Sequence, residues 1–216
     1  IASAKAMDKE ISKKIFIKHK ILTPKYIKYS FDDHFTKLIP KIKKKFGFPV
    51  VIKPINEGSS VNVYICNKSI LKNKLKKLKP YKEILIEEFI SGREIQAAIL
   101  GNKKLGAIEL KPKRKFYDYE AKYNSKAQTR HIIPVDLSKR KFNELMSISY
   151  RVHNLLGCRG VTRSDFKYYK NKFYLLETNT QPGMTKLSLV PEICMHKGIN
   201  FIKLIKLLLD DASTNK

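Results

Sequence analysis

The 216-residue chain has no tryptophan, only three cysteines, and far fewer acidic than basic side chains. Cys66, Cys158 and Cys194 are widely spaced and form no C-x-x-C pair, which argues against a disulfide framework and against structural zinc. No apolar run reaches the length of a membrane span, and no signal-peptide pattern opens the sequence. These absences lead us to expect a soluble cytoplasmic protein without a membrane partner.

The basic excess is large, because 45 Lys and Arg residues face only 19 Asp and Glu, for a net charge of +26. Only seven of these 45 residues are Arg, which is the residue favoured for bidentate contacts to phosphates and bases. The lysines are also spread along most of the chain. We interpret the charge as a solvated surface that attracts anionic nucleotides, and not as a nucleic-acid site. A non-catalytic, basic remnant that binds nucleic acid is the alternative of another class.

Hydrophobic periodicity predicts a chain that mixes helices and strands. Helices are expected over residues 3–19, 31–47 with a break near Pro40, 69–78 with Ser69 as the N-cap, 137–157, 189–198 and 200–210. Strands are expected over residues 48–54, 61–67, 83–90, 95–101 and 104–110, the last two joined by a tight turn at Gly101–Asn102. Residues 111–134 have no clean period and are predicted to form a long loop, which is usually functional or disordered.

The most informative stretch is residues 161–179, where two apolar segments flank a short polar turn, Tyr168 to Asn171. This pattern predicts a β-hairpin with Asp165 roughly opposite Glu177, and with Glu177 and Asn179 on one face. Two carboxylates so placed repel each other unless a cation lies between them. Oxygen ligands suit a hard ion such as Mg²⁺, so we expect a metal and phosphate site rather than a solvated hairpin face.

Two other segments are weaker signals when each is taken alone. The loop "KPINEGSS", residues 53–60, offers Lys53, backbone N–H groups and hydroxyls that could close over phosphates, although it is not a Walker A motif. The segment "LIEEFISGRE", residues 85–94, places Glu87, Glu88 and Glu94 at the junction of a strand and a loop. Such a junction can contact a base edge and the hydroxyls of a ribose.

Taken together and in order, the motifs resemble those of D-alanine:D-alanine ligases, which belong to the ATP-grasp superfamily. The resemblance rests on "KPINEGSS", "LIEEFISGRE", "FYDYEAKY" (116–123), "GVTRSD" (160–165) and "LLETNTQPGMTKLSLVP" (175–191). It extends from "SAKAMDK" (3–9) to the last predicted helix, so it covers almost the whole chain. The sequence departs from the family at Asn62, where glycine is usual, and at Glu88, where lysine is common.

The resemblance implies an α+β ATP-grasp fold, in which the nucleotide lies between the antiparallel sheets of two α+β subdomains. Residues 1–86 would form the central subdomain with the phosphate-covering loop 53–60. Residues 87–216 would form the C-terminal catalytic subdomain with the substrate loop 113–130. Family members also have an N-terminal α/β domain that nothing here matches, so we expect this chain to be part of a longer ligase, commonly a homodimer.

The activity implied by the resemblance is the ATP-dependent joining of two D-alanines through a D-alanyl phosphate, for peptidoglycan precursors. The implied substrates are ATP and D-alanine, with two Mg²⁺ or Mn²⁺ ions. A D-alanine:D-lactate ligase, or another ATP-grasp ligase of carboxylates and amines, is the near alternative. Tyr123 favours the dipeptide product, because ligases of the lactate type tend to lack this tyrosine.

The resemblance also assigns roles to single residues. Those expected to bind the nucleotide are Lys9 and Lys53 at its phosphates, Lys122 at the terminal phosphate, Glu87 with the backbone of Glu88 and Ile90 at adenine, and Glu94 at the ribose. Those expected to ligate the metal ions are Asp165, Glu177 and Asn179, with Glu177 bridging. Those expected at the reacting groups are Arg163 and the Gly183 N–H at the oxyanion, Ser188 and Leu189 at the second D-alanine, and Ser59 and Tyr123 at the first.

Overall fold

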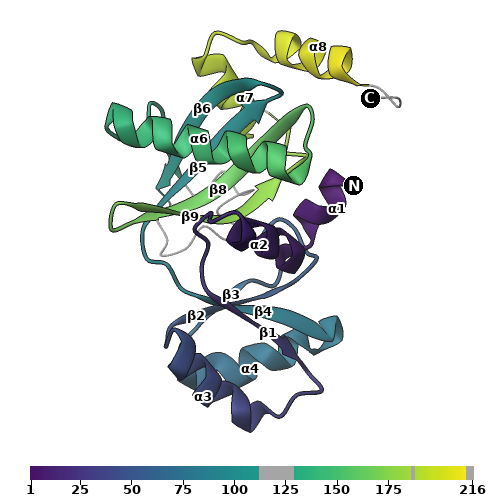
Figure 1. Cartoon of the computed structure of the whole chain (residues 1–216), viewed down its shortest axis with the longest axis vertical. Helices are drawn as coiled ribbons and strands as arrows, with labels where there is room; N and C mark the ends of the chain where they lie inside the picture. Colours follow the sequence, from purple (N-terminus) through teal and green to yellow (C-terminus); the bar gives the residue numbers. More distant parts are fainter. Residues whose placement is uncertain (112–128, 186–187, 213–216) are drawn as a thin grey trace.

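The computed structural model describes residues 1–111, 129–185 and 188–212, and two antiparallel sheets follow one another along the long axis of the molecule (Figure 1). A four-stranded sheet lies in the lower part of the view and a five-stranded sheet in the upper part. The predicted combination of helices with antiparallel sheets is confirmed. Among the described helices, none is both long enough and apolar enough to cross a membrane.

The smaller sheet has the order β1 (Tyr26–Ser30), β4 (Glu83–Glu88), β2 (Val50–Pro54) and β3 (Tyr64–Cys66), and all neighbours are antiparallel. Helices α3 (Phe35–Lys45) and α4 (Lys68–Leu78) cover one face, and a 3₁₀ turn, η1 (Lys79–Tyr81), leads into β4 (Figure 1). Apolar side chains from these helices and strands, such as Ile42, Leu71 and Ile52, fill the layer between them.

Two predictions about these helices are wrong. Helix α3 runs through Pro40 without a break, because Leu38 and Ile42 on either side of the proline are both buried against the sheet. The N-cap of α4 is Asn67 and not Ser69, since the Asn67 side chain accepts a hydrogen bond from the Ile70 amide at 3.1 Å. The Ser69 hydroxyl donates to the same Asn67 oxygen at 2.8 Å and so supports the cap.

The larger sheet has the order β7 (Arg130–Ile132), β6 (Lys103–Lys111), β5 (Arg93–Leu100), β8 (Val161–Tyr169) and β9 (Lys172–Asn179). The turn predicted at Gly101–Asn102 joins β5 to β6 and is confirmed. Strand β7 lies in the stretch that was predicted to be loop, and three residues are too few to produce a readable period.

Side chains of the larger sheet alternate between two apolar cores. Ile95 and Ile99 on β5 point to the core beneath α6 (Lys139–Leu156). The helix predicted over residues 137–157 is confirmed, with Ser138 as its N-cap and Gly157 as its C-cap. Ala98 and Leu100 point to the opposite core, which is covered by α7 (Leu189–His196) and α8 (Phe201–Asp211). The second face therefore carries apolar residues toward one end, and Glu94 lies toward the other.

The N-terminal segment forms two helices, α1 (Ala2–Met7) and α2 (Lys9–Lys18), so the single helix predicted over residues 3–19 is wrong. Asp8 interrupts it with an extended backbone, and its carboxylate accepts hydrogen bonds from the first amides of α2. Ala6 and Phe16 join the core beneath α6, so both helices pack on the larger sheet (Figure 1). The division of the chain after residue 86 stays a prediction.

Candidate active site

Strands β8 and β9 form the hairpin that the sequence predicts. A two-residue turn, Lys170–Asn171, joins them, and its φ angles of 46° and 61° suit the right-handed twist of the strands. The register places Asp165 opposite Glu177 and Arg163 opposite Asn179. Local strand pairing alone therefore brings together four side chains that the sequence identifies as candidates.

A β-bulge at Leu176 decides which face of the hairpin carries Glu177. Phe166 pairs with Leu175 and Asp165 pairs with Glu177, so Leu176 is the extra residue. Because side chains alternate along a strand, Glu177 would otherwise share the face of Leu175, which is buried in the core beneath α6. With the bulge, Leu176 and Glu177 both line the cleft between the sheets.

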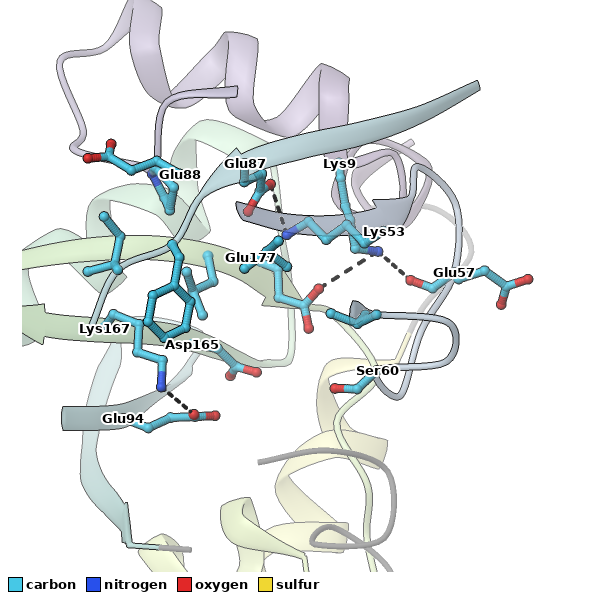
Figure 2. Close-up of a pocket in the computed structure, with 16 residues that line it drawn as sticks. Lys9, Lys53, Glu57, Ser60, Glu87, Glu88, Glu94, Asp165, Lys167 and Glu177 are labelled. Carbon is cyan, nitrogen blue, oxygen red and sulfur yellow. Dashed lines mark hydrogen bonds and ion pairs between the residues drawn. The ribbon is translucent and has the colours of Figure 1, made fainter. Parts of the chain in front are cut away.

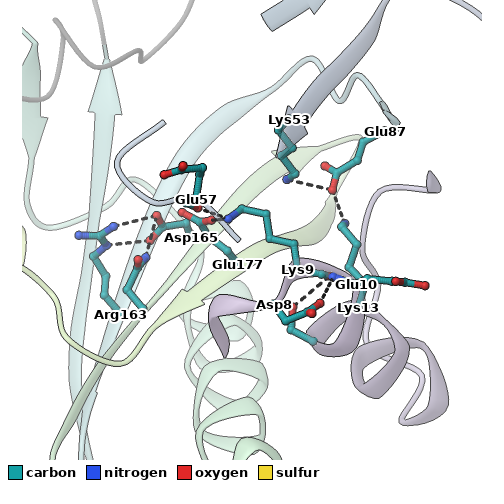
Figure 3. A network of polar contacts seen from close by, with 12 residues as sticks. Asp8, Lys9, Glu10, Lys13, Lys53, Glu57, Glu87, Arg163, Asp165 and Glu177 are labelled. Carbon is teal, nitrogen blue, oxygen red and sulfur yellow. Dashed lines mark hydrogen bonds and ion pairs between the residues drawn. The ribbon is translucent and has the colours of Figure 1, made fainter. Parts of the chain in front are cut away.

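Asp165 is held by the two residues that flank it on this face. Arg163 donates two hydrogen bonds to the carboxylate oxygens of Asp165, at 2.8 and 3.0 Å, and the Asn179 amide lies at 3.4 Å (Figure 3). Asp165 is only 4% exposed. A carboxylate buried to this extent needs such compensation, which a planar guanidinium provides in bidentate form.

Lys9 connects three parts of the structure. Its backbone amide donates to the Ile55 carbonyl at 3.1 Å, and its ammonium donates to the Glu57 carbonyl. The same ammonium lies 3.8 Å from a carboxylate oxygen of Glu177 (Figure 2). Burial lowers the pKa of Lys9, and Glu177 opposes this effect in part. The break at Asp8 therefore places the Lys9 ammonium, at the start of α2, between the loop after β2 and strand β9. Its charge is partly compensated by Glu177.

Glu87 on β4 lies between two lysines (Figure 3). The ammonium groups of Lys53 and Lys13 approach the same oxygen, Oε1, at 2.9 and 3.1 Å. Burial alone would raise the pKa of Glu87, but the charges of Lys13 and Lys53 outweigh it and lower the pKa. Burial also lowers the pKa of Lys13 to about 8, against the attraction of Glu87. The two lysines thus favour the ionised form of a carboxylate that is only 2% exposed.

These side chains lie around a cleft between the sheets, and the empty space in it and at its open mouth is about 790 Å³ (Figure 2). Its apolar walls are formed by Val51, Val63 and Leu176, together with Phe89 and Ile90 in the segment that links β4 to β5. The polar and remaining lining residues are Lys9, Pro24, Lys53, Glu57, Ser60, Glu87, Glu88, Glu94, Asp165, Lys167 and Glu177. Such a cleft suits a flat, partly apolar ligand that carries anionic groups.

Comparison with known proteins agrees with this geometry. A family model described as "D-ala D-ala ligase C-terminus" matches residues 18–210. A D-alanine:D-alanine ligase of Pelagibacter ubique is 67% identical over the whole chain, which spans 71% of that protein. The chain belongs to the D-alanine:D-alanine ligase family. The two-sheet architecture is accordingly that of the ATP-grasp fold.

Solved structures give the same result for the fold. The D-alanine:D-alanine ligase of Bacillus anthracis is 32% identical, with a TM-score of 0.85 over 97% of this chain and 68% of that one. A second structure of that ligase, complexed with ATP, is 31% identical, with a TM-score of 0.81 over 97% of this chain and 67% of that one. The match covers both sheets, so the likeness concerns the cleft as well as each half.

Most residues to which the family resemblance assigns a nucleotide role line the cleft. They are Lys9, Lys53, Glu87, Glu88, Ile90 and Glu94. Lys122 lies outside the described residues. The Glu88 amide already donates to the Lys25 carbonyl at 2.8 Å, so this residue would offer a base its carbonyl rather than its N–H. The roles themselves stay predictions.

Residues assigned to the amino-acid substrates lie around the start of α7. Ser188 is the N-cap residue and Leu189 the first residue of this helix. The Ser188 hydroxyl accepts a hydrogen bond from the Thr185 amide at 2.9 Å, and a Cβ on Gly183 would lie only 2.7 Å from it. A side chain at position 183 would therefore force the Ser188 hydroxyl out of its hydrogen bond with Thr185. Tyr123 lies outside the described residues.

The loop after β2 has an unusual backbone, because Ser59, Ser60 and Asn62 have φ angles of 48°, 59° and 56°. Such left-handed conformations favour glycine, and asparagine is among the few other residues that tolerate them. This explains how Asn62 can replace the glycine that is usual in the family. The Asn62 amide also donates to the Tyr81 hydroxyl at 2.8 Å and accepts from the Tyr64 hydroxyl at 3.0 Å. Ser60 lines the cleft, and the role of Ser59 at the first D-alanine stays a prediction.

Two lysines near the cleft were missed by the sequence reasoning. Lys167 lines the cleft and donates to Glu94 at 2.9 Å, and it shares a strand face with Asp165 two residues away. Lys13 lies four residues after Lys9, which is one helical turn along the same side of α2. Both spacings, two residues on a strand and four on a helix, can be recognised in the sequence, but neither lysine is distinctive among 45 basic residues.

Proposed function

We propose that this protein uses ATP to join two D-alanines into D-alanyl-D-alanine for peptidoglycan synthesis in the cytoplasm. The observation that carries the proposal is the position of the Asp165–Glu177 pair beside an apolar cleft that also contains Lys9 and Lys53. Membership of the D-alanine:D-alanine ligase family supplies the identity of the substrate. The cleft supplies groups for the nucleotide, and the hairpin supplies groups for the charge that is transferred.

The nucleotide would lie in the cleft with its base between the apolar walls, Val51 on one side and Leu176 on the other. Lys9 and Lys53 would contact its phosphates, and Lys122 the terminal phosphate. Glu94 would accept hydrogen bonds from the ribose. The contact of Lys167 with Glu94 at 2.9 Å supports this placement, because it keeps a buried carboxylate compensated at the sugar position.

Asp165, Glu177 and Asn179 fit a pair of Mg²⁺ or Mn²⁺ ions. Their donors are oxygens, the two carboxylates lie directly opposite each other, and the Asn179 amide presents an oxygen after a half-turn of the side chain. Ions bound there would neutralise phosphate charge and polarise the transferred group. Glu177, which also lies beside Lys9, would bridge the two ions.

The reaction follows from the chemistry of the substrates. A carboxylate oxygen of the first D-alanine attacks the γ-phosphorus of ATP, ADP leaves, and a D-alanyl phosphate forms. The amine of the second D-alanine attacks the acyl carbon and gives up a proton, and inorganic phosphate leaves. Acyl phosphates hydrolyse in water, so exclusion of solvent from the reacting groups would protect the intermediate.

Charge develops on the acyl oxygen in the second step, and the protein supplies fixed donors for it. Arg163 and the Gly183 N–H would stabilise this oxyanion, and one such donor is typically worth about 10²–10³ in rate. Ser188 and the backbone of Leu189 would bind the carboxylate of the second D-alanine. The first D-alanine would be positioned by Ser59 and Tyr123.

The proposal is tested by incubating the protein with ATP, MgCl₂ and D-alanine, and by following phosphate release together with the mass of the product. We expect phosphate and D-alanyl-D-alanine in equal amounts, and no product with L-alanine. A second reaction with D-lactate added tests the depsipeptide alternative. Product formed only with another acid, or ATP hydrolysis that is indifferent to D-alanine, would contradict the proposal.

A further inference from the structure

Lys13 on α2 is completely buried, with 0% of its surface exposed, and the reaction described above gives it no role. A buried ammonium is costly unless it is paired. An apolar side chain at this position of α2 would pack against its surroundings without that cost. The charge of Lys13 therefore calls for a functional explanation.

Lys13 itself does not line the cleft, and its ammonium points to Glu87 (Figure 3). Its ammonium lies 3.1 Å from Oε1 of Glu87, 2.7 Å from the Thr23 hydroxyl and 3.5 Å from the Pro24 carbonyl. An ammonium has three donors, and three acceptors surround this one. Lys13 can therefore affect a ligand in the cleft only through a neighbouring residue, and Glu87 is the charged neighbour that lines the cleft.

Lys53 contacts the same oxygen of Glu87 at 2.9 Å but is placed differently. Its side chain lines the cleft, where it would share its charge with the phosphates of a nucleotide. The charge of Lys13 stays with Glu87 whatever the cleft contains. Lys13 also comes from α2, which packs on the larger sheet, whereas Glu87 belongs to the smaller sheet. The contact thus fixes Glu87 relative to both walls of the cleft.

We propose that Lys13 is a positioning residue for recognition of the nucleotide base. It holds Glu87 ionised and in one orientation, so that this carboxylate accepts a hydrogen bond from the exocyclic amino group of adenine. The protein thereby prefers a purine that carries this amino group to one that lacks it. The inference rests on the proposed nucleotide role of the cleft and adds a specificity determinant to it.

The electrostatics of Glu87 support this role. Burial raises the pKa of Glu87, and Lys13 and Lys53 together overcome it. Without Lys13, burial gains weight and favours the neutral acid, which donates a hydrogen bond where the amino group needs an acceptor. The charge of Lys53 lowers the pKa of Lys13 and the charge of Glu177 raises it, in addition to the larger effects of burial and of Glu87.

The test measures the affinities of the protein for ATP and for purine riboside triphosphate, which lacks the 6-amino group, by calorimetry without D-alanine. A hydrogen bond to a charged group predicts that the parent protein prefers ATP by about tenfold or more. In Lys13→Met we expect ATP to lose most of this advantage while the affinity for the analogue stays near the parent value. Lys14→Met, an exposed lysine on the same helix, is the matched control and should keep the preference.

Three results would overturn the inference. Equal weakening of both nucleotides would indicate a structural role for Lys13, an unchanged preference would indicate no role, and no preference in the parent would exclude recognition of the amino group. If Lys13→Met does not show a cooperative melting curve, Lys13→Gln, which keeps a donor but no charge, decides the question. The proposed ligation fails independently if ATP binds with the predicted preference but no dipeptide forms.

Discussion

Arg163 and Asp165, two residues apart on β8, form a bidentate ion pair with nitrogen–oxygen distances of 2.8 and 3.0 Å. We assign Arg163 to the oxyanion and Asp165 to the metal ions. In the structure the guanidinium and the carboxylate that would contact these ligands bind each other. Ligand binding would then exchange one set of charge partners for another without leaving either charge uncompensated. The planar fork of arginine makes this exchange possible, because it can keep one hydrogen bond while it releases another.

Replacing this guanidinium with an ammonium tests its role. Arg163→Lys keeps the charge but loses the fork, so we expect kcat to fall by about 10²–10³, the effect of removing one oxyanion donor. The KM for ATP should change little, because Arg163 does not line the cleft. Steady-state kinetics measure both constants. Arg159→Lys, which alters a surface pair with Asp211, is the control, and a kcat of the parent size in Arg163→Lys would refute the assignment.

Glu177→Gln tests the metal site. The substitution preserves the size of the side chain but removes the charge that would bridge two cations, so turnover should be nearly abolished and the Mg²⁺ requirement should rise. The rate is measured across a titration with MgCl₂ and again with MnCl₂. Glu144→Gln on the exposed side of α6 should leave the titration unchanged. Near-normal turnover of Glu177→Gln with an unchanged melting temperature would exclude the bridging role.

The hairpin was predictable from sequence because its signals are local. The polar turn and the apolar segments beside it predicted the hairpin and placed Asp165 roughly opposite Glu177, and the structure pairs these two residues through the bulge at Leu176. The bulge at Leu176 was not predictable in the same way, because a leucine fits either the core or the wall of the cleft. An extra residue leaves no mark on the pattern when both faces at that point accept an apolar side chain.

The cleft itself could not be derived from periodicity. It requires β2 and β4 of one sheet to face β8 and β9 of the other, which is a tertiary arrangement that only the family resemblance implied. The burial of Lys13 depends on the same arrangement, since helix α2 brings it to Glu87 from the opposite sheet. In a chain this rich in lysine, a single lysine considered alone predicts only an exposed surface position.

The left-handed backbone at Asn62 makes a prediction about stability. Asn62→Ala should lower the free energy of unfolding by about 1–2 kcal/mol, because alanine is strained at a φ of 56° and cannot contact Tyr81 or Tyr64. Asn62→Gly removes the same contacts but accepts the backbone, so it should cost less. Urea unfolding of both variants separates the two effects. Equal losses for the two variants would show that the side-chain contacts account for the effect, and a larger loss for glycine would contradict backbone strain at this position.

Gln96 on β5 is 1% exposed, and both polar atoms of its amide lack a hydrogen-bond partner among the described residues. A buried, unsatisfied polar group costs about 1–3 kcal/mol, so Gln96→Met, which has a similar shape, should raise the melting temperature. Differential scanning calorimetry measures the change, and Gln96→Glu should lower the temperature by burying a charge beside Asp165. A lower melting temperature for Gln96→Met would show that the amide contributes to the fold.

The buried lysine predicts a pH dependence of stability. The pKa of Lys13 is about 8 in the folded chain against 10.5 ordinarily, because of burial, so the unfolded chain holds more protons between these values. Stability therefore rises with pH in this interval, and the cost of burying the charge is full below it and absent above it.

Urea titration measures this effect as the difference in unfolding free energy between the parent and Lys13→Met. From about pH 7 to pH 10 this difference should shift in favour of the parent. Lys14→Met should show a flat difference over the same range, because its ion pair with Glu10 raises the pKa of Lys14 above 10.5. A flat difference for Lys13→Met as well would mean that the ammonium is not buried in solution as it is in the structure.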